Sequence, residues 1–158
     1  MKKHLEKYNL LGLINLLLNL FYTKVFFRSA FLVRRPLYIR TVGKISTGRG
    51  LMIGPSSIID VLAKDAVLRF GNNVKINHRF HVGVTSRVDI GNHVLIGSNV
   101  TIIDHNHGSY AGASQSAPSE LPVNRPLKSQ PIIIGERVWI ADNAVIMPGV
   151  QIGAGAII

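Results

Sequence analysis

The stretch Ile90–Ile102 reads IGNHVLIGSNVTI, with an isoleucine at every sixth position and a glycine after the first two. This spacing differs from the 3.6-residue period of a helix and from the two-residue alternation of a strand. A six-residue repeat is typical of a parallel β-helix, in which short strands turn corners and aliphatic side chains stack inside. After an interruption the same register resumes at Ile134, Ile140, Ile146, Ile152 and Ile158.

The register is less regular upstream of Ile90. Ile76 and Val82 keep the six-residue spacing, and a slip of two residues before Ile90 predicts a bulged corner. Residues 41–69 are expected to form irregular first coils, because the repeat is interrupted there. Pro36 is expected to end a helical region, because proline is poorly placed inside a helix.

The composition fits one hydrophobic domain with a basic N-terminal appendage. The 158 residues are 47% hydrophobic and include no cysteine, which excludes disulfides and thiolate chemistry. The net charge is +10, and residues 1–49 contain ten Lys or Arg against the single acid Glu6. No basic-aromatic motif accompanies these cations, so the sequence predicts no nucleic-acid partner.

Residues 1–35 are predicted to form a basic, apolar helical segment, and residues 36–158 the β-helix. The run Leu10–Tyr22 is apolar, but Lys24 and Arg28 follow too soon for a membrane-spanning helix, which needs about 20 apolar residues. Such a helix could lie in the headgroup plane of an anionic membrane, or it could pack against its own domain or between subunits. A narrow polar stripe runs along it at four-residue spacing, formed by Asn15, Asn19 and Thr23.

The repeat is interrupted by residues 104–131, which predict a long extruded loop. A loop of this length inside a regular solenoid is more often functional than idle. It opens with the run DHNHG at 104–108, which includes His105 and His107. Imidazole titrates near neutral pH and can accept a proton from a hydroxyl, so these histidines are the candidate catalytic residues.

Three stretches resemble the hexapeptide-repeat O-acetyltransferases: the DHNHG run, LPVNRPL at 121–127 and IGERVWI at 134–140. The resemblance covers roughly residues 34–158 and is strongest to the branch that acetylates bacterial cell-surface sugars of lipopolysaccharide or capsule. Galactoside, maltose and virginiamycin acetyltransferases are also similar. The resemblance implies a left-handed parallel β-helix and a homotrimer that binds acetyl-CoA between neighbouring subunits.

The same resemblance implies a sugar or oligosaccharide acceptor and no bound metal. It also implies a cytoplasmic enzyme, which would be peripheral on the inner face of the cytoplasmic membrane if residues 1–35 bind lipid. The handedness of the coil comes from the family alone, since left-handed crossovers are an exception among parallel strands.

In the family, the catalytic histidine lies seven residues after the valine of an Asn-Val-Thr stretch. Here the valine is Val100, which places the catalytic residue at His107. His105, two residues upstream, is the less favoured candidate. The resemblance implies that His107 acts as a general base in a direct transfer from acetyl-CoA, without an acyl-enzyme.

The acceptor site is expected to include Asn77, where the galactoside enzymes carry an asparagine that binds the sugar. An amide can both donate to and accept from a hydroxyl. Thr85 stands where those enzymes carry an aspartate, and this departure predicts a different acceptor. Asp104 and Asn106, beside the two histidines, complete the predicted acceptor contacts.

Trp139 corresponds to the family's tryptophan in the first coil after the loop, where it lines the site. Coenzyme A is expected to run, largely through backbone contacts, along the coils that hold Ala141, Asp142, Met147 and Gly149. Family members continue past the equivalent of Ile158, so the C-terminal coils of this sequence look shortened beside theirs.

Two other functions remain open from the sequence. A catalytically inactive trimeric scaffold would account for shortened coils. A zinc enzyme similar to the γ-class carbonic anhydrases would use three histidines from neighbouring subunits. The pair of histidines five apart that those enzymes carry on one coil is absent, and Trp139 favours acetyl transfer. The candidate zinc ligands would be His78, His81, His105 and His107.

Overall fold

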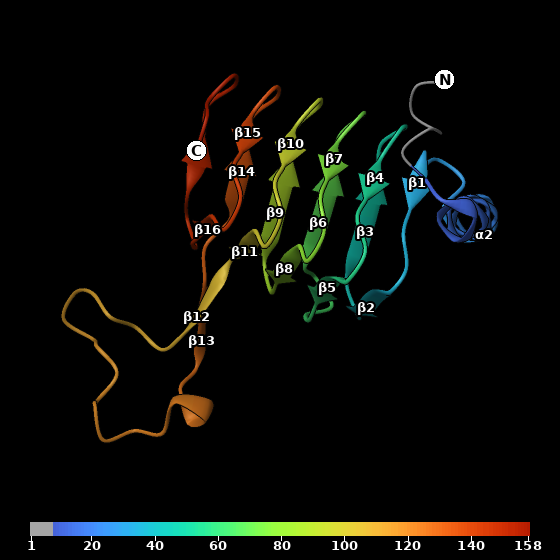
Figure 1. Ribbon diagram of the computed structural model, residues 1–158. Coiled ribbons are helices and arrows are strands. Elements are labelled where there is room, and N and C mark those ends of the chain that lie inside the picture. Colours follow the sequence, from blue (N-terminus) through green and yellow to red (C-terminus); the bar gives the residue numbers. More distant parts are fainter. Residues whose placement is uncertain (1–7) are drawn as a thin grey trace.

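The computed structural model describes residues 8–158 as a parallel β-helix, with a helix at its N-terminal end and an arm projecting from its side (Figure 1). Each coil contributes one strand to each of three five-stranded parallel sheets, so neighbouring strands in a sheet come from successive coils. The parallel β-helix, the N-terminal helix and the extruded loop predicted from the sequence are therefore confirmed.

The strands of each sheet stack in chain order. Sheet A consists of β1 (Leu32–Val33), β4 (Met52–Ile53), β7 (Lys75–Ile76), β10 (Leu95–Ile96) and β15 (Trp139–Ile140). Sheet B consists of β2 (Leu37–Thr41), β5 (Ser57–Val61), β8 (His81–Val84), β11 (Thr101–Ile103) and β16 (Val145–Ile146). Sheet C consists of β3 (Lys44–Thr47), β6 (Val67–Phe70), β9 (Arg87–Ile90), β14 (Ile132–Ile134) and β17 (Gln151–Ile152).

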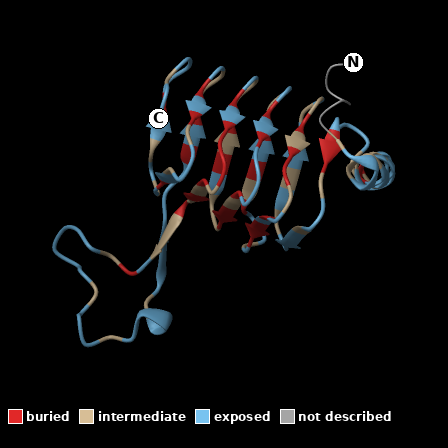
Figure 2. Cartoon of the chain, in the orientation of Figure 1, coloured by how far each residue is buried: buried red, intermediate tan, exposed pale blue. Residues whose placement is uncertain are grey.

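The core is a set of columns of aliphatic side chains inside the coils. Ile76, Ile96 and Ile140 occupy matching positions in sheet A and are at most 4% exposed. Figure 2 shows buried residues concentrated in the coils, while most of the arm is exposed. Burying one such side chain is worth about 1.5–3 kcal/mol, so each column contributes to stability coil by coil.

The corner between sheets B and C accounts for the irregular spacing before Ile90. β8 and β9 are each four residues long and are joined by Thr85 and Ser86. Val84 and Val88 are fully buried, so the extra residues lengthen the strands inside the core. β8 and β9 pair with the preceding coil without a break in register, and the predicted bulged corner is therefore wrong.

The first coils are more regular than their sequence suggests. Residues 41–69 contain the complete strands β3, β4 and β5. The interruption at Lys64-Asp65 falls in the turn that joins β5 to β6, and β5 stays in register with both neighbouring strands. The expectation of irregular coils is thus corrected to one long turn.

Helix α2 (Leu10–Phe26) begins at Asn9, whose side chain accepts a hydrogen bond from the backbone N–H of Gly12 at 2.8 Å. The expectation that the helical region ends at Pro36 is wrong, because the helix ends at Phe26. Leu32 and Val33 already form β1, which pairs with β4, so the first coil starts before the boundary expected at residue 35. Within residues 8–158, no helix is long and apolar enough to cross a bilayer.

The polar stripe of α2 faces the solenoid. Thr23 is fully buried, and its Oγ1 accepts a hydrogen bond from the backbone N–H of Val33 at 2.8 Å. The Oδ1 of Asn19 accepts from the backbone N–H of Arg35 at 3.0 Å. Because β1 is an edge strand, these contacts satisfy backbone donors in β1 and just after it that no neighbouring strand pairs. One side of the helix is therefore packed against its own domain, while the opposite side is exposed.

The loop at 104–131 is an ordered arm. It contains β12 (His105–His107) and β13 (Leu127–Ser129), which pair antiparallel, and the short 3₁₀ helix η1 (Pro122–Asn124). At its root, the backbone N–H of Gln130 donates to the carbonyl oxygen of Asp104 at 2.8 Å. The arm leaves sheet B after β11 and returns to sheet C at β14, so it replaces one corner of the coil.

We expect Thr23→Val to lower the free energy of unfolding by about 1–3 kcal/mol, because it leaves the buried N–H of Val33 without its acceptor. Thr23→Ser keeps the hydroxyl and should lose less. Urea unfolding measures both changes. Equal stabilities of the two variants would show that the hydroxyl does not hold α2 on β1.

Candidate active site

Asp104 anchors the arm where it leaves the coil. Its side chain is fully buried, and its carboxylate accepts three hydrogen bonds from the turn between β8 and β9. Oδ1 accepts from the backbone N–H of Thr85 at 2.8 Å and from the Thr85 hydroxyl at 3.0 Å. Oδ2 accepts from the backbone N–H of Ser86 at 2.6 Å. The structure thus brings the predicted residues Asp104 and Thr85 together, with Thr85 as a donor to the carboxylate.

His105 lies against this carboxylate. Its Nδ1 is 3.0 Å from Oδ1 of Asp104, and its side chain is 12% exposed. On the strand below, a Cβ at Gly83 would lie 3.4 Å from Cε1 of His105, so the absence of a side chain there gives the ring room. A carboxylate at Nδ1 fixes the ring orientation and leaves Nε2 as the nitrogen for other contacts.

His107 lies on the same side of β12, because side chains two residues apart share a face of a strand. Its ring centroid is 6.5 Å from that of His105, with the rings at 63°. The His107 side chain is exposed, while its carbonyl oxygen accepts a hydrogen bond from the hydroxyl of Tyr110. An exposed imidazole at the root of the arm can reach a group that comes from outside the chain.

Asn106 is on the other side of β12. It is opposite Lys128 in the antiparallel pair and lines a shallow hollow with Lys128, Gln130 and Pro148. Asn106 is therefore near the histidines in sequence but separated from their rings by the strand.

Arg125 holds the arm in shape, a role that the sequence did not reveal. Its guanidinium donates to the carbonyl oxygen of Glu120 at 2.9 and 3.2 Å and to that of Ala117 at 3.3 Å. It also donates to the hydroxyl of Tyr110 at 3.2 Å, and this hydroxyl donates to His107. A chain of hydrogen bonds therefore connects the far part of the arm to the backbone of a candidate catalytic residue.

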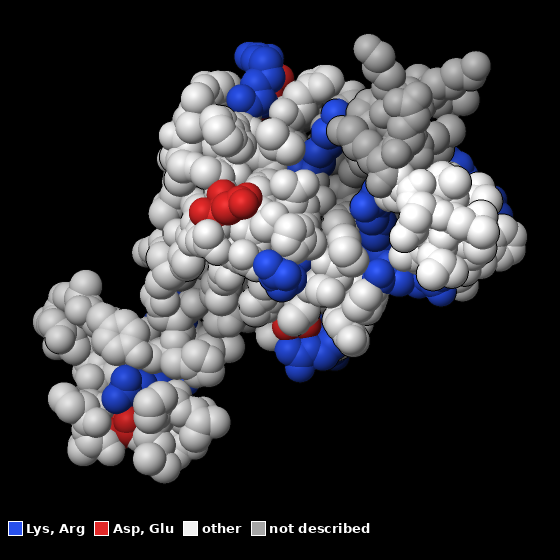
Figure 3. All heavy atoms as spheres, viewed as in Figure 1, with Lys and Arg blue, Asp and Glu red and all other residues white. Residues whose placement is uncertain are grey.

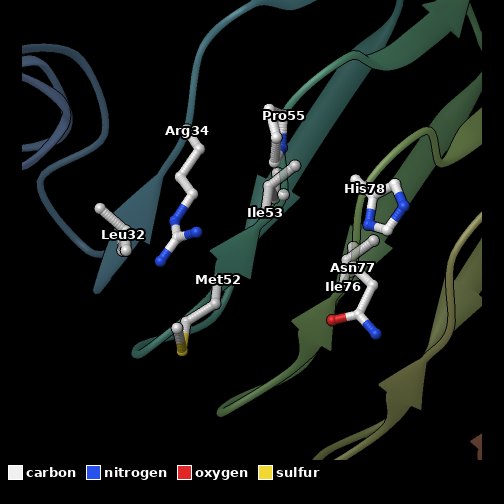
Figure 4. Close-up of a pocket in the computed structure, with 9 residues that line it drawn as sticks. Leu32, Arg34, Met52, Ile53, Pro55, Ile76, Asn77 and His78 are labelled. Atoms are coloured by element: carbon white, nitrogen blue, oxygen red, sulfur yellow. The ribbon is translucent and has the colours of Figure 1, made fainter. Parts of the chain in front are cut away.

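Asn77 lies at a different corner of the coil. It follows β7 in sheet A, whereas His105 and His107 follow β11 in sheet B. Asn77 borders a hollow of about 280 Å³ between β1, β4 and β7. Figure 4 shows Arg34 at one end of this hollow and Asn77 and His78 at the other, with Ile53 and Pro55 between. A single chain therefore does not bring Asn77 to the histidines.

Arg34 is the cation of this hollow, and no pattern in the sequence indicated that it would lie near Asn77. Its Nη2 donates to the hydroxyl of Tyr8 at 2.7 Å. His78 Nδ1 is 3.2 Å from the hydroxyl of Ser98, on the next coil. The hollow therefore combines a guanidinium, an amide and an imidazole, groups that can bind sugar hydroxyls or an anion.

The residues predicted to bind coenzyme A lie at two different corners of the coil, one between sheets A and B and the other between sheets B and C. Trp139 is 47% exposed on sheet A, and Oδ1 of Asp142 accepts from the backbone N–H of Ser98 at 2.6 Å. Ala141 lies between them, at the corner of Asn77. Met147 and Gly149 lie at the other corner, next to the root of the arm, where Gly149 N–H donates to the carbonyl oxygen of Gln130 at 3.2 Å.

A polar cluster lies on the outer face of sheet B, and its nearest member, His81, is one coil before His105. Arg40 donates through Nε and Nη2 to the two carboxylate oxygens of Asp60, at 2.8 Å each, and this bidentate pair lowers the pKa of Asp60 below its usual range. His81 Nε2 is 3.6 Å from Oδ2 of Asp60. A lowered carboxyl pKa stabilises the fold above the ordinary pKa of aspartate, and that stabilisation is lost as the pH falls below it.

Asp60 is opposite Gly83 in the pairing of β5 with β8, and Gly83 in turn lies next to the His105 ring. The cluster is therefore in line with His105 along the stack of coils.

The four histidines considered as zinc ligands are distributed over three places: His78 after β7, His81 in β8, and the pair in β12. Residues 8–158 of one chain bring together no group of three His, Asp or Glu side chains that could hold a metal ion.

Comparison with known proteins identifies the family. The model of the bacterial transferase hexapeptide, with six repeats, matches residues 131–158. WbbJ of Escherichia coli, provisionally named as a lipopolysaccharide biosynthesis O-acetyl transferase, is 36% identical over 154 residues, which cover 97% of this chain and 78% of that protein. Galactoside O-acetyltransferase of Escherichia coli is 35% identical over 95 residues, which cover 56% of this chain and 43% of that enzyme.

A solved structure of AntD, an N-acyltransferase from Bacillus cereus in complex with dTDP and coenzyme A, is 18% identical with a TM-score of 0.39, covering 86% of this chain and 75% of that one. A likeness at this level supports no inference. The match to WbbJ decides the matter: the chain belongs to the bacterial hexapeptide-repeat transferases. Its relatives WbbJ and galactoside O-acetyltransferase carry the names of O-acetyltransferases, as the resemblance of the sequence implied.

We expect Arg125→Ala to loosen the arm, because it removes donors to Glu120, Ala117 and Tyr110 at once. Amide hydrogen exchange should rise in residues 108–124 while the coils keep their protection. Lys128→Ala, an exposed cation of β13, is the matched control and should leave exchange unchanged. Faster exchange in the coils as well would mean that Arg125 supports the whole fold rather than the arm.

Proposed function

We propose that the protein is an acetyl-CoA-dependent O-acetyltransferase that acts on a sugar hydroxyl of a bacterial cell-surface polysaccharide or its lipid-linked precursor. The relationship to WbbJ, over 97% of this chain, is the observation that carries the proposal. The pair of histidines at the root of the arm supports it, because O-acetyl transfer needs a base for the hydroxyl proton. The proposed place of action is the cytoplasm, at the inner face of the cytoplasmic membrane.

His107 is the proposed general base. Its imidazole takes the proton of the acceptor hydroxyl as the oxygen attacks the thioester carbonyl of acetyl-CoA, and it returns this proton to the departing thiolate. The acetyl ester forms in this one transfer, and no bond to the protein is made. The exposure of His107 supports the choice, because the acceptor approaches from outside the chain.

His105 is the proposed positioning residue, and it is also the rival base. Its contact with Asp104 is the kind that orients a catalytic imidazole. Against that role, the His105 ring is only 12% exposed, so an acceptor has little access to it. In the proposed arrangement the His105 ring, held by Asp104, packs beside the His107 ring and limits its orientation.

A homotrimer would complete the site. The residues predicted for acceptor and coenzyme lie at two corners of one chain, with Asn77 and Trp139 at one and His107 and Met147 at the other. In a closed ring of three copies, one corner of each chain can face the other corner of its neighbour. We propose that acetyl-CoA and the acceptor bind between copies in this way.

Multi-angle light scattering should give a single species of three times the 17.3 kDa chain mass. The physical reason is that closed symmetry covers the flat faces of the coils without open-ended growth. A monodisperse monomer that transfers acetyl groups would contradict the shared site, because the two corners would then have to work apart.

We expect His107→Asn to lower kcat by about 10² to 10⁴, the usual contribution of a general base, while the affinity for acetyl-CoA changes little. His105→Asn should cost less, since it affects the base only through its position. The measurements are steady-state acetyl transfer and calorimetric titration with acetyl-CoA. If His105→Asn instead causes the larger loss of kcat, His105, whose imidazole Asp104 orients, is the base.

Calorimetric titration of the unaltered protein also separates the proposed enzyme from an inactive scaffold. Binding of acetyl-CoA supports the transferase before the acceptor is known. A trimer that binds no acetyl-CoA would point to the scaffold.

A further inference from the structure

The outer face of α2 is apolar and has no partner among residues 8–158. Asn19 and Thr23 are turned toward the solenoid, which leaves a row of aliphatic and aromatic side chains on the opposite side of the helix. Six of these side chains are 47% to 76% exposed: Leu10, Leu11, Ile14, Leu17, Leu18 and Phe21. We call these six residues the outer face of α2. Water-soluble domains rarely expose so continuous an apolar surface unless something binds it.

The orientation of α2 is fixed by hydrogen bonds. Thr23 accepts from the backbone N–H of Val33 in β1, and Asn19 accepts from that of Arg35 two residues later; both side chains are at most 3% exposed. Rotating the helix to bury its leucines would break these bonds and leave the donors of an edge strand unpaired, at a cost of about 1–3 kcal/mol for each group. The apolar face is therefore held outward by the contacts that dock the helix.

Basic side chains flank the outer face, and carboxylates are missing from this part of the sequence. Lys24 and Arg28 are exposed on or just after the helix, and no Asp or Glu occurs between Tyr8 and Ile59. Figure 3 shows α2 as an uncharged surface with Lys and Arg atoms along its margin. An apolar strip with a basic margin is the surface that anionic phospholipids bind.

The charge also distinguishes a lipid surface from a second copy of the chain. Two copies joined through this face would place the cations of both chains along one interface, with no Asp or Glu between Tyr8 and Ile59 to pair with them. Anionic headgroups, in contrast, attract each of these cations. A helix of 17 residues is about 25 Å long, which suits an orientation along the membrane surface.

We propose that the outer face of α2 docks on a membrane surface rich in anionic phospholipid, with the helix axis in the headgroup plane and Lys24 and Arg28 among the headgroups. This docking is independent of acetyl transfer, because α2 covers the first coil while the candidate base lies after β11, in the fourth. It would bring the proposed enzyme to lipid-linked acceptors.

The test is flotation of the full chain with vesicles of phosphatidylcholine alone and of phosphatidylcholine mixed with phosphatidylglycerol. We expect binding to the mixed vesicles, and weaker binding as the salt concentration rises. Leu17→Glu with Phe21→Glu should lower the partition by about 10²-fold, since each removes one buried side chain from the lipid. Lys24→Gln should lower it by about fivefold.

Val123→Glu is the matched control, since it places the same charge at an exposed apolar residue of η1, and it should float as the unaltered chain does. Circular dichroism of each variant checks the fold. Flotation that ignores both lipid charge and the double glutamate variant would overturn the proposal. So would a double variant with a smaller assembly by light scattering, because the outer face would then be a contact between copies.

Acetyl transfer to a soluble sugar distinguishes the two proposals. The double glutamate variant should keep this activity and lose flotation. A protein that floats but transfers no acetyl group would overturn the proposed function and leave the docking surface in place.

Discussion

The fold depends on columns of aliphatic side chains, each resting on the matching residue of the coil before it. Ile140 rests on Ile96, and Ile96 on Ile76, and none of the three is exposed to more than 4%. Because each coil buries its side chains mainly against its neighbours, the corners are free to carry polar turns, an arm or a helix without disturbing the core. The candidate site is built from such corners: the carboxylate of Asp104 and the hollow beside Asn77 both lie outside the columns.

The spacing of isoleucines was sufficient to predict the coils, because each coil must place an aliphatic side chain on the matching one of the coil before it. The sequence was insufficient to predict how α2 packs. The stripe of Asn19 and Thr23 could be read from the sequence, but the direction in which it faces depends on the unpaired backbone of β1, which lies beyond the end of the helix. Pro36 was a misleading signal for the end of the helix, because the helix end also depends on β1. Leu32 and Val33 pair with β4, and this pairing requires an extended chain before Pro36.

The candidate site was predictable only where its residues are close in sequence. The run from Asp104 to His107 marked the root of the arm, and its histidines share one side of a strand. The donors that hold Asp104 come from Thr85 and Ser86 on another coil, and no local pattern indicates them. Arg125 is a similar case, because its partners are carbonyl oxygens of an irregular segment. Asn77 belongs to a second corner, which shows that matching a family position does not place a residue beside the candidate base within one chain.

Because the coils stack at a constant spacing, the distance between α2 and any other coil follows from the number of coils between them. Successive strands of a sheet are about 4.8 Å apart, and the histidines leave from the fourth coil, three spacings from the coil that α2 covers. Together with a helix about 10 Å thick, this puts the histidines roughly 25 Å from any surface on which α2 lies. A lipid-anchored glycan would then be modified at a sugar some distance along its chain, and the number of coils between helix and arm would act as a ruler that selects which sugar is reached.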